Sequence, residues 1–229
     1  MKILFDGDTL CYRTVFSVGL EASEKVCFSE FDDNLGQIFL DLDQPLSGID
    51  YHIYLTGKGN FRYDIAKTAV YKGQRPKEKP PNLEPLRQYI MKRYPVTVSS
   101  GEEADDLIAI EATKVGPERA VIVSIDKDFM QVPSWNYNPA KGKWTRVDHW
   151  NGLRYFYEQV LTGDRVDNIL GIYGIGPVKA KVILEGALNE KDLYERCVAA
   201  YDGDVDRVIE NGRLLWLRRY EGQIWEPPQ

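Results

Sequence analysis

Two carboxylates close the first apolar run of the chain, in the stretch LFDGDTL at residues 4–10. Asp6 and Asp8 are one residue apart, and such a pair suits two kinds of chemistry. One carboxylate can accept a phosphoryl group as a nucleophile, or the carboxylates can hold a hard divalent cation. Which of the two applies depends on the acids elsewhere in the chain.

Three later stretches are also rich in acids, namely GEEADDLIA (101–109), SIDKDF (124–129) and LTGDRVDN (161–168). If the acids converge, their mutual repulsion raises several pKa values unless cations neutralise them. Two divalent ions about 3.5–4 Å apart would do so, and that arrangement hydrolyses phosphodiesters. The candidate ligands found in this way are Asp6, Asp105, Asp106, Asp126, Asp128, Asp164 and Asp167.

Each acidic motif also has a structural interpretation. Glu103 fits a capping box in which its side chain folds back on the Ser100 amide. Asp126 fits an Asx turn after a strand, and Asp164 with Asp167 fits the cap of a helix, at a spacing of one helical turn. Capping does not explain Asp105, which borders the apolar face of its helix and would be costly there without a partner.

The elements that must position these acids are predicted to form a wound α/β sheet. Nearly continuous apolar runs at 2–5, 51–55, 96–98 and 119–125 are typical of buried parallel strands, and helical patterns lie between them at 82–94 and 101–115. WNYNPAKGKWTRV (135–147) predicts a hairpin. Ligands of such sheets bind at the carboxyl ends of the strands, so we expect Asp6 and Asp126 to project into one crevice.

From about Trp150 the pattern becomes helical, interrupted by the glycine-rich stretch GIYGIG. The segment GIYGIGPVKA (171–180) resembles the hairpin of a helix-hairpin-helix DNA-binding element, in which glycines let the backbone approach a phosphate. A simple turn is the alternative. A Walker loop is excluded, because Pro177 stands where that motif requires lysine.

Composition is that of an ordinary soluble chain of 229 residues, with 43% hydrophobic and 28% charged residues. No apolar run reaches membrane-spanning length, and the start lacks the pattern of a signal peptide, so we expect no membrane contact. Three widely spaced cysteines predict a reduced, cytoplasmic setting. With only two histidines, any metal would be held by oxygen.

Charge is distributed unevenly along the chain. Residues 58–93 contain ten Lys or Arg against three acids, a net charge of +7, whereas the whole chain carries −6. The basic stretch includes a Pro- and charge-rich segment, PKEKPP (76–81). A solvated helix face is one interpretation of such a stretch. The other is a basic strip beside an acidic site, which suits a polyanion drawn towards bound cations.

Taken in order, the motifs resemble the flap endonuclease/5′–3′ exonuclease family, close to its short bacteriophage members, over about residues 2–185. They are FDGD with Arg13, FR (61–62), YKGQRP (71–76), EADD (103–106), DKDF (126–129), GDRVDN (163–168) and GIYGIGPVKA (171–180). The resemblance implies a metal-dependent 5′ nuclease that acts on DNA as a monomer. It also implies a PIN-like core with a mainly parallel twisted sheet over residues 1–150. A helical DNA-binding module would follow at 151–229, with the helix-hairpin-helix element at about 161–185 and a tail that packs on the core.

The resemblance also assigns roles to residues. It adds Glu103 to the seven aspartates above as residues that hold or surround two Mg²⁺ or Mn²⁺ ions. Lys72 and Arg75 would lie on a basic arch helix within about 58–81 and contact the scissile phosphate, and the hairpin 171–180 would hold a K⁺ ion. The implied DNA-binding residues are Arg62, Lys67, Lys72, Arg75, Gly174, Gly176 and Lys179.

One departure from the family pattern concerns the end of the second strand. The family usually has FDGK there, whereas this chain has LTGK, with Thr56 or Gly57 in place of an aspartate. Asp8 is a candidate replacement. Two other classes therefore stay open: a DNA-binding relative with reduced catalysis, and a haloacid-dehalogenase-type phosphatase whose nucleophile is Asp6 in an Asp-Gly-Asp-Thr motif.

Overall fold

The computed structural model describes residues 1–43, 48–76 and 78–229, and it contains a six-stranded twisted sheet at its centre. The strands lie in the order β3 (Val96–Ser100), β2 (Asp50–Lys58), β1 (Lys2–Asp6), β4 (Ala120–Val123), β5 (Ser134–Asn138) and β6 (Lys143–Val147). The first five are parallel, and β6 pairs antiparallel with β5. The predicted α/β class, the four strands and the hairpin are confirmed.

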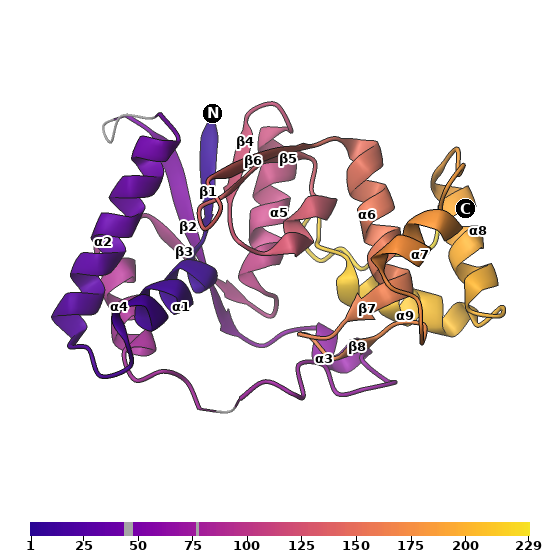
Figure 1. Ribbon diagram of the computed structural model, residues 1–229, viewed down its shortest axis with the longest axis horizontal. Coiled ribbons are helices and arrows are strands. Elements are labelled where there is room, and N and C mark those ends of the chain that lie inside the picture. The colour runs from indigo at the N-terminus through magenta and orange to yellow at the C-terminus, as the bar shows by residue number, and fades with distance from the viewer. Residues whose placement is uncertain (44–47, 77) are drawn as a thin grey trace.

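Helices cover both faces of the sheet because successive strand residues point to opposite sides. On β1, Ile3 and Phe5 pack with α1 (Gly7–Val18), α2 (Glu24–Asp41) and α4 (Leu83–Arg93). Leu4 between them packs with α5 (Ala104–Val115) on the other face. Figure 1 shows α1, α2 and α4 at one end of the molecule, with the sheet and α5 towards the middle.

The opposite end of the molecule is helical (Figure 1). It comprises α6 (His149–Thr162), α7 (Pro177–Ile183), α8 (Glu190–Ala200) and α9 (Val205–Leu215), which share a core around Phe156 and Val160. A two-stranded ribbon, β7 (Gly163–Asp164) and β8 (Ile169–Leu170), follows α6. The boundary predicted near residue 150 thus falls close to the start of α6.

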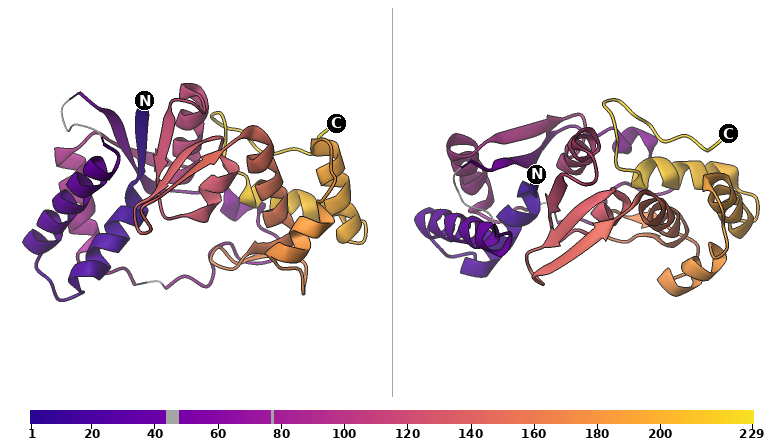
Figure 2. Two further views of the ribbon diagram at one scale, coloured as in Figure 1. Left: turned by 45° about the horizontal axis from the view of Figure 1, so that its top comes forward. Right: turned by 90° about the horizontal axis from the view of Figure 1, so that it is seen from above.

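The C-terminal tail returns to the centre of the molecule after α9, as the yellow trace in Figure 2 shows. The backbone amide of Leu217 donates to Gln131 in the short 3₁₀ helix η1 (Lys127–Gln131), and the amide of Arg218 donates to Asp106 on α5. Trp225 is buried in the helical core. The tail therefore links the sheet region to the helices.

The segment between α3 (Arg62–Ile65) and α4 runs along the lower edge of the molecule in Figure 1. Its described residues, 66–76 and 78–82, form turns and extended backbone without a helix, so the expectation of an arch helix that carries Lys72 and Arg75 is wrong for this structure. Lys77, one of the ten basic residues counted above, lies outside the described residues. We call residues 66–76 the crossing segment.

Two local predictions are also wrong. Helix α5 begins at Ala104, and its capping box joins Glu103 to Asp106 instead of Ser100 to Glu103, because Gly101 turns the chain with φ of +79° before the helix starts. The stretch 163–168 is a strand and turn instead of a helical turn, since α6 ends at Thr162 and Asn168 has φ of +57°. The first motif therefore spans the start of α5, and the second lies on β7 and the turn that follows it.

Within the described ranges, no helix combines the length and the apolar character that a membrane crossing requires.

Candidate active site

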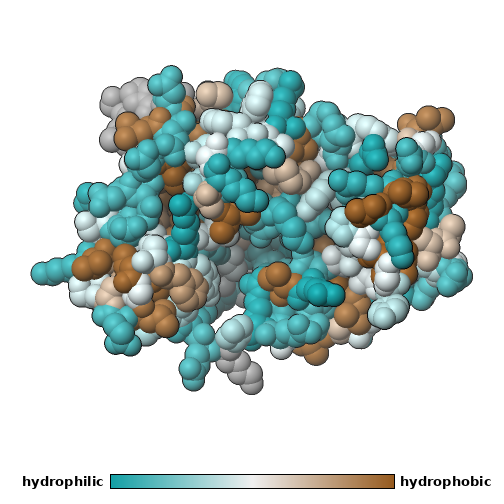
Figure 3. Space-filling model, viewed as in Figure 1, coloured by the Kyte–Doolittle hydropathy of each residue, from teal (hydrophilic) through white to brown (hydrophobic). Residues whose placement is uncertain are grey.

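A cavity of about 400 Å³ opens at the carboxyl ends of β1 and β2, beside the start of α5. The space-filling view is hollowed in its lower middle, between the two ends of the molecule (Figure 3). Of the residues predicted from the sequence, six line this cavity: Asp6, Glu103, Asp105, Asp126, Lys72 and Arg75. The parallel sheet thus brings together side chains from four distant stretches of the chain, as expected for ligand sites of open α/β sheets.

Asp6 and Asp105 form the inner part of the cavity. Asp6 is 1% exposed, and its carboxylate accepts hydrogen bonds from Ser124 Oγ at 2.6 Å and from the Thr9 amide at 3.1 Å. Burial, with the negative charges of Asp8 and Asp126 nearby, raises the pKa of Asp6 to about 7. Burial and the charges of Asp6 and Asp126 hold the pKa of Asp105 well above its usual range. Raised pKa values of this kind are typical of buried carboxylates that lie close to one another.

A second group of acids lies on the other side of Asp126. Burial and then the charges of Asp126 and Asp164 raise the pKa of Asp128 to about 7. The pKa of Asp126 is itself raised by burial and by the charges of Asp167 and Asp164. Asp126 therefore belongs to both groups, one formed with Asp6 and Asp105 and one formed with Asp128, Asp164 and Asp167.

Protein cations partly neutralise the second group. Lys127 Nζ lies 2.6 Å from Asp164, although the lysine side chain is 58% exposed. Arg75 contacts Asp167 at 2.6 Å, and Gln159 donates to Asp128 at 2.7 Å. An exposed lysine is held weakly, so a bound ion or a ligand can displace it.

Lys72 is placed by the contact of the crossing segment with the turn at 163–168. The Lys72 amide donates to the Asp167 carbonyl at 2.8 Å, and Lys72 has φ of +55°. The hydroxyl of the buried Tyr71 donates to Glu103 and to Asp167, each at 2.8 Å. Lys72 Nζ pairs with Glu103 and lies 3.6 Å from Asp167. These contacts fix the lysine above the carboxylates without an arch helix.

Asp106 and Arg62 form a buried ion pair and are not part of the cavity lining. The Arg62 side chain is fully buried and pairs with both oxygens of Asp106, at 2.6 and 2.9 Å. Arg62 also donates to the carbonyls of Leu214 and Trp216. Asp106 is 0% exposed, and the buried arginine holds its pKa below the usual range even though burial alone raises it. The pair joins α3, α5 and the tail, and both oxygens of Asp106 accept hydrogen bonds.

Thr56 ends the buried part of β2, and its hydroxyl accepts the Ala104 amide at 3.0 Å, which caps α5. Its own amide donates to Asp8 at 2.8 Å. Asp8 also forms an ion pair with Arg87 of α4. The hydroxyl that replaces the expected aspartate is thus used for capping, and Asp8 lies beside it already paired.

The remaining predicted DNA-binding residues lie outside the cavity. Gly174 and Gly176 belong to an open hairpin whose tip, Tyr173, is fully exposed, and Lys179 Nζ donates to the Gly174 carbonyl at 2.9 Å. The side chain of Lys67 is exposed at the base of the crossing segment. Exposure of these residues is compatible with contact to a large ligand.

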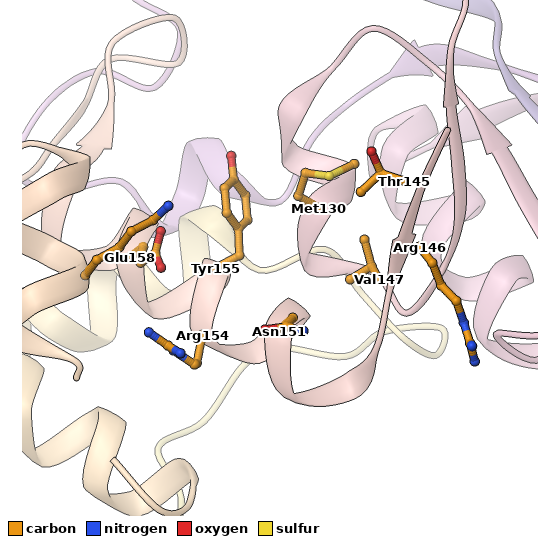
Figure 4. Close-up of a pocket in the computed structure, with 9 residues that line it drawn as sticks. Met130, Thr145, Arg146, Val147, Asn151, Arg154, Tyr155 and Glu158 are labelled. Carbon is orange, nitrogen blue, oxygen red and sulfur yellow. The ribbon is translucent and has the colours of Figure 1, made fainter. Parts of the chain in front are cut away.

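A second cavity, of about 420 Å³, lies between the β5–β6 hairpin and α6 (Figure 4). Tyr155 stands on one side with Arg154 and Glu158 on the same helix, and Met130 and Val147 stand across from it. Burial and the charges of Asp128 and Asp126 raise the pKa of the Tyr155 phenol, so this cavity adjoins the second carboxylate group. The sequence did not point to it, since its lining comes from three separated segments.

The side chains that could donate to a metal ion in this cavity are carboxylates. In residues 1–43, 48–76 and 78–229, no three His, Cys, Asp or Glu side chains are gathered closely enough around one point to form a ready-made metal site. The chemistry of the donors nevertheless fits hard divalent ions, because they are carboxylates with raised pKa values that share one cavity. Small side-chain movements would have to accompany binding.

Several contributors to the site escaped the sequence analysis. Arg87, Tyr71, Ser124 and Gln159 contact the acidic residues from other elements. Ser124 could have been found, because it is the first residue of SIDKDF and lies directly after β4, two residues before Asp126. Arg87 could not, since 79 residues separate it from Asp8.

No protein-family model matches the chain. Among curated proteins, the DNA polymerase I of Rhizobium leguminosarum is 35% identical over 151 residues, which cover 59% of this chain and 15% of that protein. The flap endonuclease Xni of Vibrio campbellii is 33% identical over 139 residues, 51% of this chain and 50% of that protein. The matches thus span about half of the flap endonuclease and a small part of the polymerase.

Among solved structures, the T5 D15 protein co-crystallised with metal ions matches with a TM-score of 0.73 at 14% identity, over 93% of this chain and 88% of that one. The catalytic core of Rad2 in complex with DNA substrate matches with a TM-score of 0.56 at 15% identity, over 85% of this chain and 64% of that one. At these identities, the structural matches show the fold.

The parallel sheet, whose strand ends carry converging carboxylates, matches the fold of the T5 D15 protein. The sequence matches and the fold relate the chain to the flap endonuclease/5′–3′ exonuclease family, close in fold to the bacteriophage T5 enzyme. The resemblance found in the sequence is confirmed.

Proposed function

We propose that this chain is a divalent-metal-dependent 5′ nuclease that hydrolyses phosphodiester bonds of DNA. The observation that carries the proposal is the pair of carboxylate groups that share Asp126, because Asp126 lines one cavity with Asp6, Asp105, Lys72 and Arg75. Relatives named as flap endonucleases and a similar fold co-crystallised with metal ions support it.

Asp6, Asp105 and Asp126 would hold one ion, and Asp126, Asp128, Asp164 and Asp167 would surround the other; Glu103 lies beside the first group and pairs with Lys72. Mg²⁺ and Mn²⁺ suit such oxygen donors. When bound, these ions would supply a nucleophile from water and offset negative charge on the attacked phosphate.

Lys72 and Arg75 would bind the phosphate at the mouth of the cavity. The two basic side chains form ion pairs with acids of the site, Lys72 with Glu103 and Arg75 with Asp167. Divalent ions that neutralise those acids would free the two side chains to donate to phosphoryl oxygens. The ion pairs therefore keep the phosphate-binding groups in place before DNA arrives.

Duplex DNA would extend from the cavity towards the helical end of the molecule. We assign its backbone to the hairpin 171–180, through Gly174, Gly176 and Lys179, with Lys67 at the base of the crossing segment. A K⁺ ion at this hairpin and a monomeric state remain parts of the proposal. The exposed Tyr173 and Val178 mark this face as open to a partner.

The rival phosphatase mechanism requires Asp6 to attack a phosphoryl group. Both oxygens of Asp6 already accept hydrogen bonds, and the residue is almost fully buried. Asp8, its neighbour in that motif, is paired with Arg87. These contacts favour a role of Asp6 in metal binding over a role as nucleophile.

The test compares three DNA substrates labelled at the 5′ end (a flap, a blunt duplex and a single strand) with a small phosphomonoester, in Mg²⁺ and in EDTA. We expect Mg²⁺-dependent cleavage of DNA near the 5′ end, and none with the Asp126→Asn variant. Hydrolysis of the monoester alone would establish a phosphatase, and DNA binding without cleavage would establish a non-catalytic relative.

A further inference from the structure

Arg87 introduces a fixed positive charge into the carboxylate cavity. It lies on α4, outside every acidic motif, yet its side chain is 13% exposed and lines the same cavity as Asp6, Asp105 and Asp126. Arginine carries its positive charge on a planar group whose N–H donors match a carboxylate. Arg87 therefore brings a positive charge to the Asp8 end of the cavity.

The contacts of this guanidinium are the ones a metal ion would make. Nη1 pairs with Asp8 Oδ1, and Nη2 donates to the Thr56 carbonyl at 2.6 Å. A carboxylate oxygen and a backbone carbonyl oxygen are both ligand types of hard divalent ions. The other Asp8 oxygen accepts the Thr56 amide at 2.8 Å, so both oxygens of this carboxylate have partners.

The acids at the other end of the cavity differ from Asp8. In the part of the chain that the structure describes, the Asp105 side chain forms no hydrogen bond or ion pair, and Asp6 has hydrogen-bond donors but no ion pair. Asp8, in contrast, is paired with Arg87. A direct cationic partner is therefore present at Asp8 and absent at Asp6 and Asp105 among the described residues.

We propose that Arg87 takes the place of a divalent ion at the Asp8–Thr56 end of the cavity, withholds these two oxygens from metal, and confines metal ions to the Asp126 side. Arg87 is then a positioning residue, since it determines where ions bind without itself needing to touch DNA. The inference rests on the proposed function only in that divalent ions bind this cavity.

Removal of the guanidinium should create an additional ion site. A partly buried carboxylate that loses its partner is left with an uncompensated charge. A divalent ion can neutralise that charge, and the freed Thr56 carbonyl can serve as a second ligand. Arg87→Met keeps much of the side-chain volume while it removes the charge. The gain should depend on Asp8, because the other ligand, the carbonyl, is neutral.

The experiment is a calorimetric titration of the full chain with Ca²⁺, without DNA, so that no catalysis is needed. We expect Arg87→Met to bind one more ion per chain than the unmodified protein, and the double variant Arg87→Met with Asp8→Asn to lose that ion again. Arg93→Met is the matched control, because Arg93 lies on the same helix, pairs with Asp32 and is 58% exposed. It should bind the unmodified number of ions.

Asp8→Asn alone gives an arm that does not depend on the folding of the Arg87 variant. If Asp8 is withheld from metal, this variant binds the same number of ions as the unmodified protein. Loss of an ion in Asp8→Asn, or equal numbers in Arg87→Met and the unmodified protein, would overturn the inference. Failure of the proposed metal site itself would look different: Asp126→Asn would then bind as many ions, as tightly, as the unmodified protein.

Discussion

Asp126 is the residue common to both carboxylate groups, and its replacement tests them together. Asp126→Asn removes a ligand from each proposed ion, so we expect DNA cleavage in Mg²⁺ to fall to background. It also removes a charge that raises the pKa values of Asp105 and Asp128. In EDTA the variant should therefore melt at the same temperature as the unmodified protein or above it, because repulsion in the folded state decreases.

The check is a pair of measurements on one preparation, a cleavage rate in Mg²⁺ and a melting temperature in EDTA. Asp148→Ala is a useful contrast, since it removes the N-cap of α6 and relieves no repulsion among the acids of the site. That variant should lose stability and keep activity. A large drop in melting temperature for Asp126→Asn would mean that Asp126 is a structural residue.

We expect Lys72 to contribute to the rate of cleavage more than to the affinity for DNA. Lys72→Ala removes one donor to the phosphoryl oxygens, which reduces the single-turnover rate at saturating DNA by about 10²–10³-fold. Affinity measured in Ca²⁺ should change little. Lys141→Ala is the control, because Lys141 is exposed in the turn between β5 and β6 and does not line the cavity. A normal rate with collapsed affinity would show that Lys72 only tethers DNA.

At the scale of elements, the sequence predicted strands better than connections. Continuous apolar runs identified β1 to β4 because burial on both faces leaves a local signal. The crossing segment has no such signal: its path depends on contacts with residues about 90 to 140 positions away, such as Asp167 and Glu210. The resemblance to a family suggested a helix there, and the turns at 71–74 replace it.

Glu210 on α9 anchors the start of the crossing segment. One carboxylate oxygen accepts the amides of Lys67 and Thr68, each at 2.8 Å, and the other accepts the Thr68 hydroxyl at 2.6 Å. Glu210→Gln should destabilise the protein by about 1–3 kcal/mol at pH 7, the usual range for hydrogen bonds to a buried charged group. It should also slow cleavage, because Lys72 lies four residues beyond Thr68.

The effect of Glu210→Gln on the free energy of unfolding should depend on pH. Burial raises the pKa of Glu210, but the hydrogen bonds from Thr68 and Lys67 outweigh it and bring the folded-state pKa below 4.5. A depressed pKa contributes stability above the unfolded-state value and loses it as pH falls through the folded-state value. The difference in the free energy of unfolding between Glu210→Gln and the unmodified protein, measured by urea unfolding, should therefore reach its full size at pH 7 and decrease below pH 4.5.

Glu226→Gln is the matched control for this series, since Glu226 pairs with Arg213 on the surface with 63% exposure. Exposed ion pairs contribute little, so its unfolding free energy should barely change. A gap for Glu210→Gln that is independent of pH would show that the carboxylate charge is not what holds the crossing segment.

At the scale of the whole molecule, the hairpin 171–180 is expected to hold duplex DNA away from the cavity. Gly176→Val is the cleaner test, because a Cβ there meets no atom within 4 Å, whereas Gly174 has φ of +76° and would be strained by any side chain. We expect weaker binding of long duplex and a shallower dependence of log affinity on log salt as a phosphate contact is lost. Short 5′-tailed substrates should be affected less.

The control is Gly36→Val on α2, where an added Cβ also meets nothing within 4 Å. It should leave both substrates unchanged. Equal losses on long and short substrates by Gly176→Val, with a lowered melting temperature, would indicate a folding defect and refute the role of the hairpin.

The site was predicted in part, for reasons that follow from the fold. Asp6, Asp105 and Asp126 were found because acids that follow parallel strands meet at one edge of the sheet. The ion pair of Asp106 was not predicted, since only the three-dimensional structure shows that the buried Arg62 contacts both of its oxygens. Arg87 was missed because a helix surface gives no sign of which of its charges enters a distant cavity.

The central claim is that divalent ions bind at the carboxylates around Asp126, and locating the ions tests it most directly. The measurement is anomalous X-ray scattering from crystals of the protein soaked in Mn²⁺. We predict Mn²⁺ peaks bounded by Asp6, Asp105 and Asp126 and by Asp128, Asp164 and Asp167, and none between Asp8 and the Thr56 carbonyl, where Arg87 lies. Absence of any peak beside Asp126 in a fully soaked crystal would contradict the account.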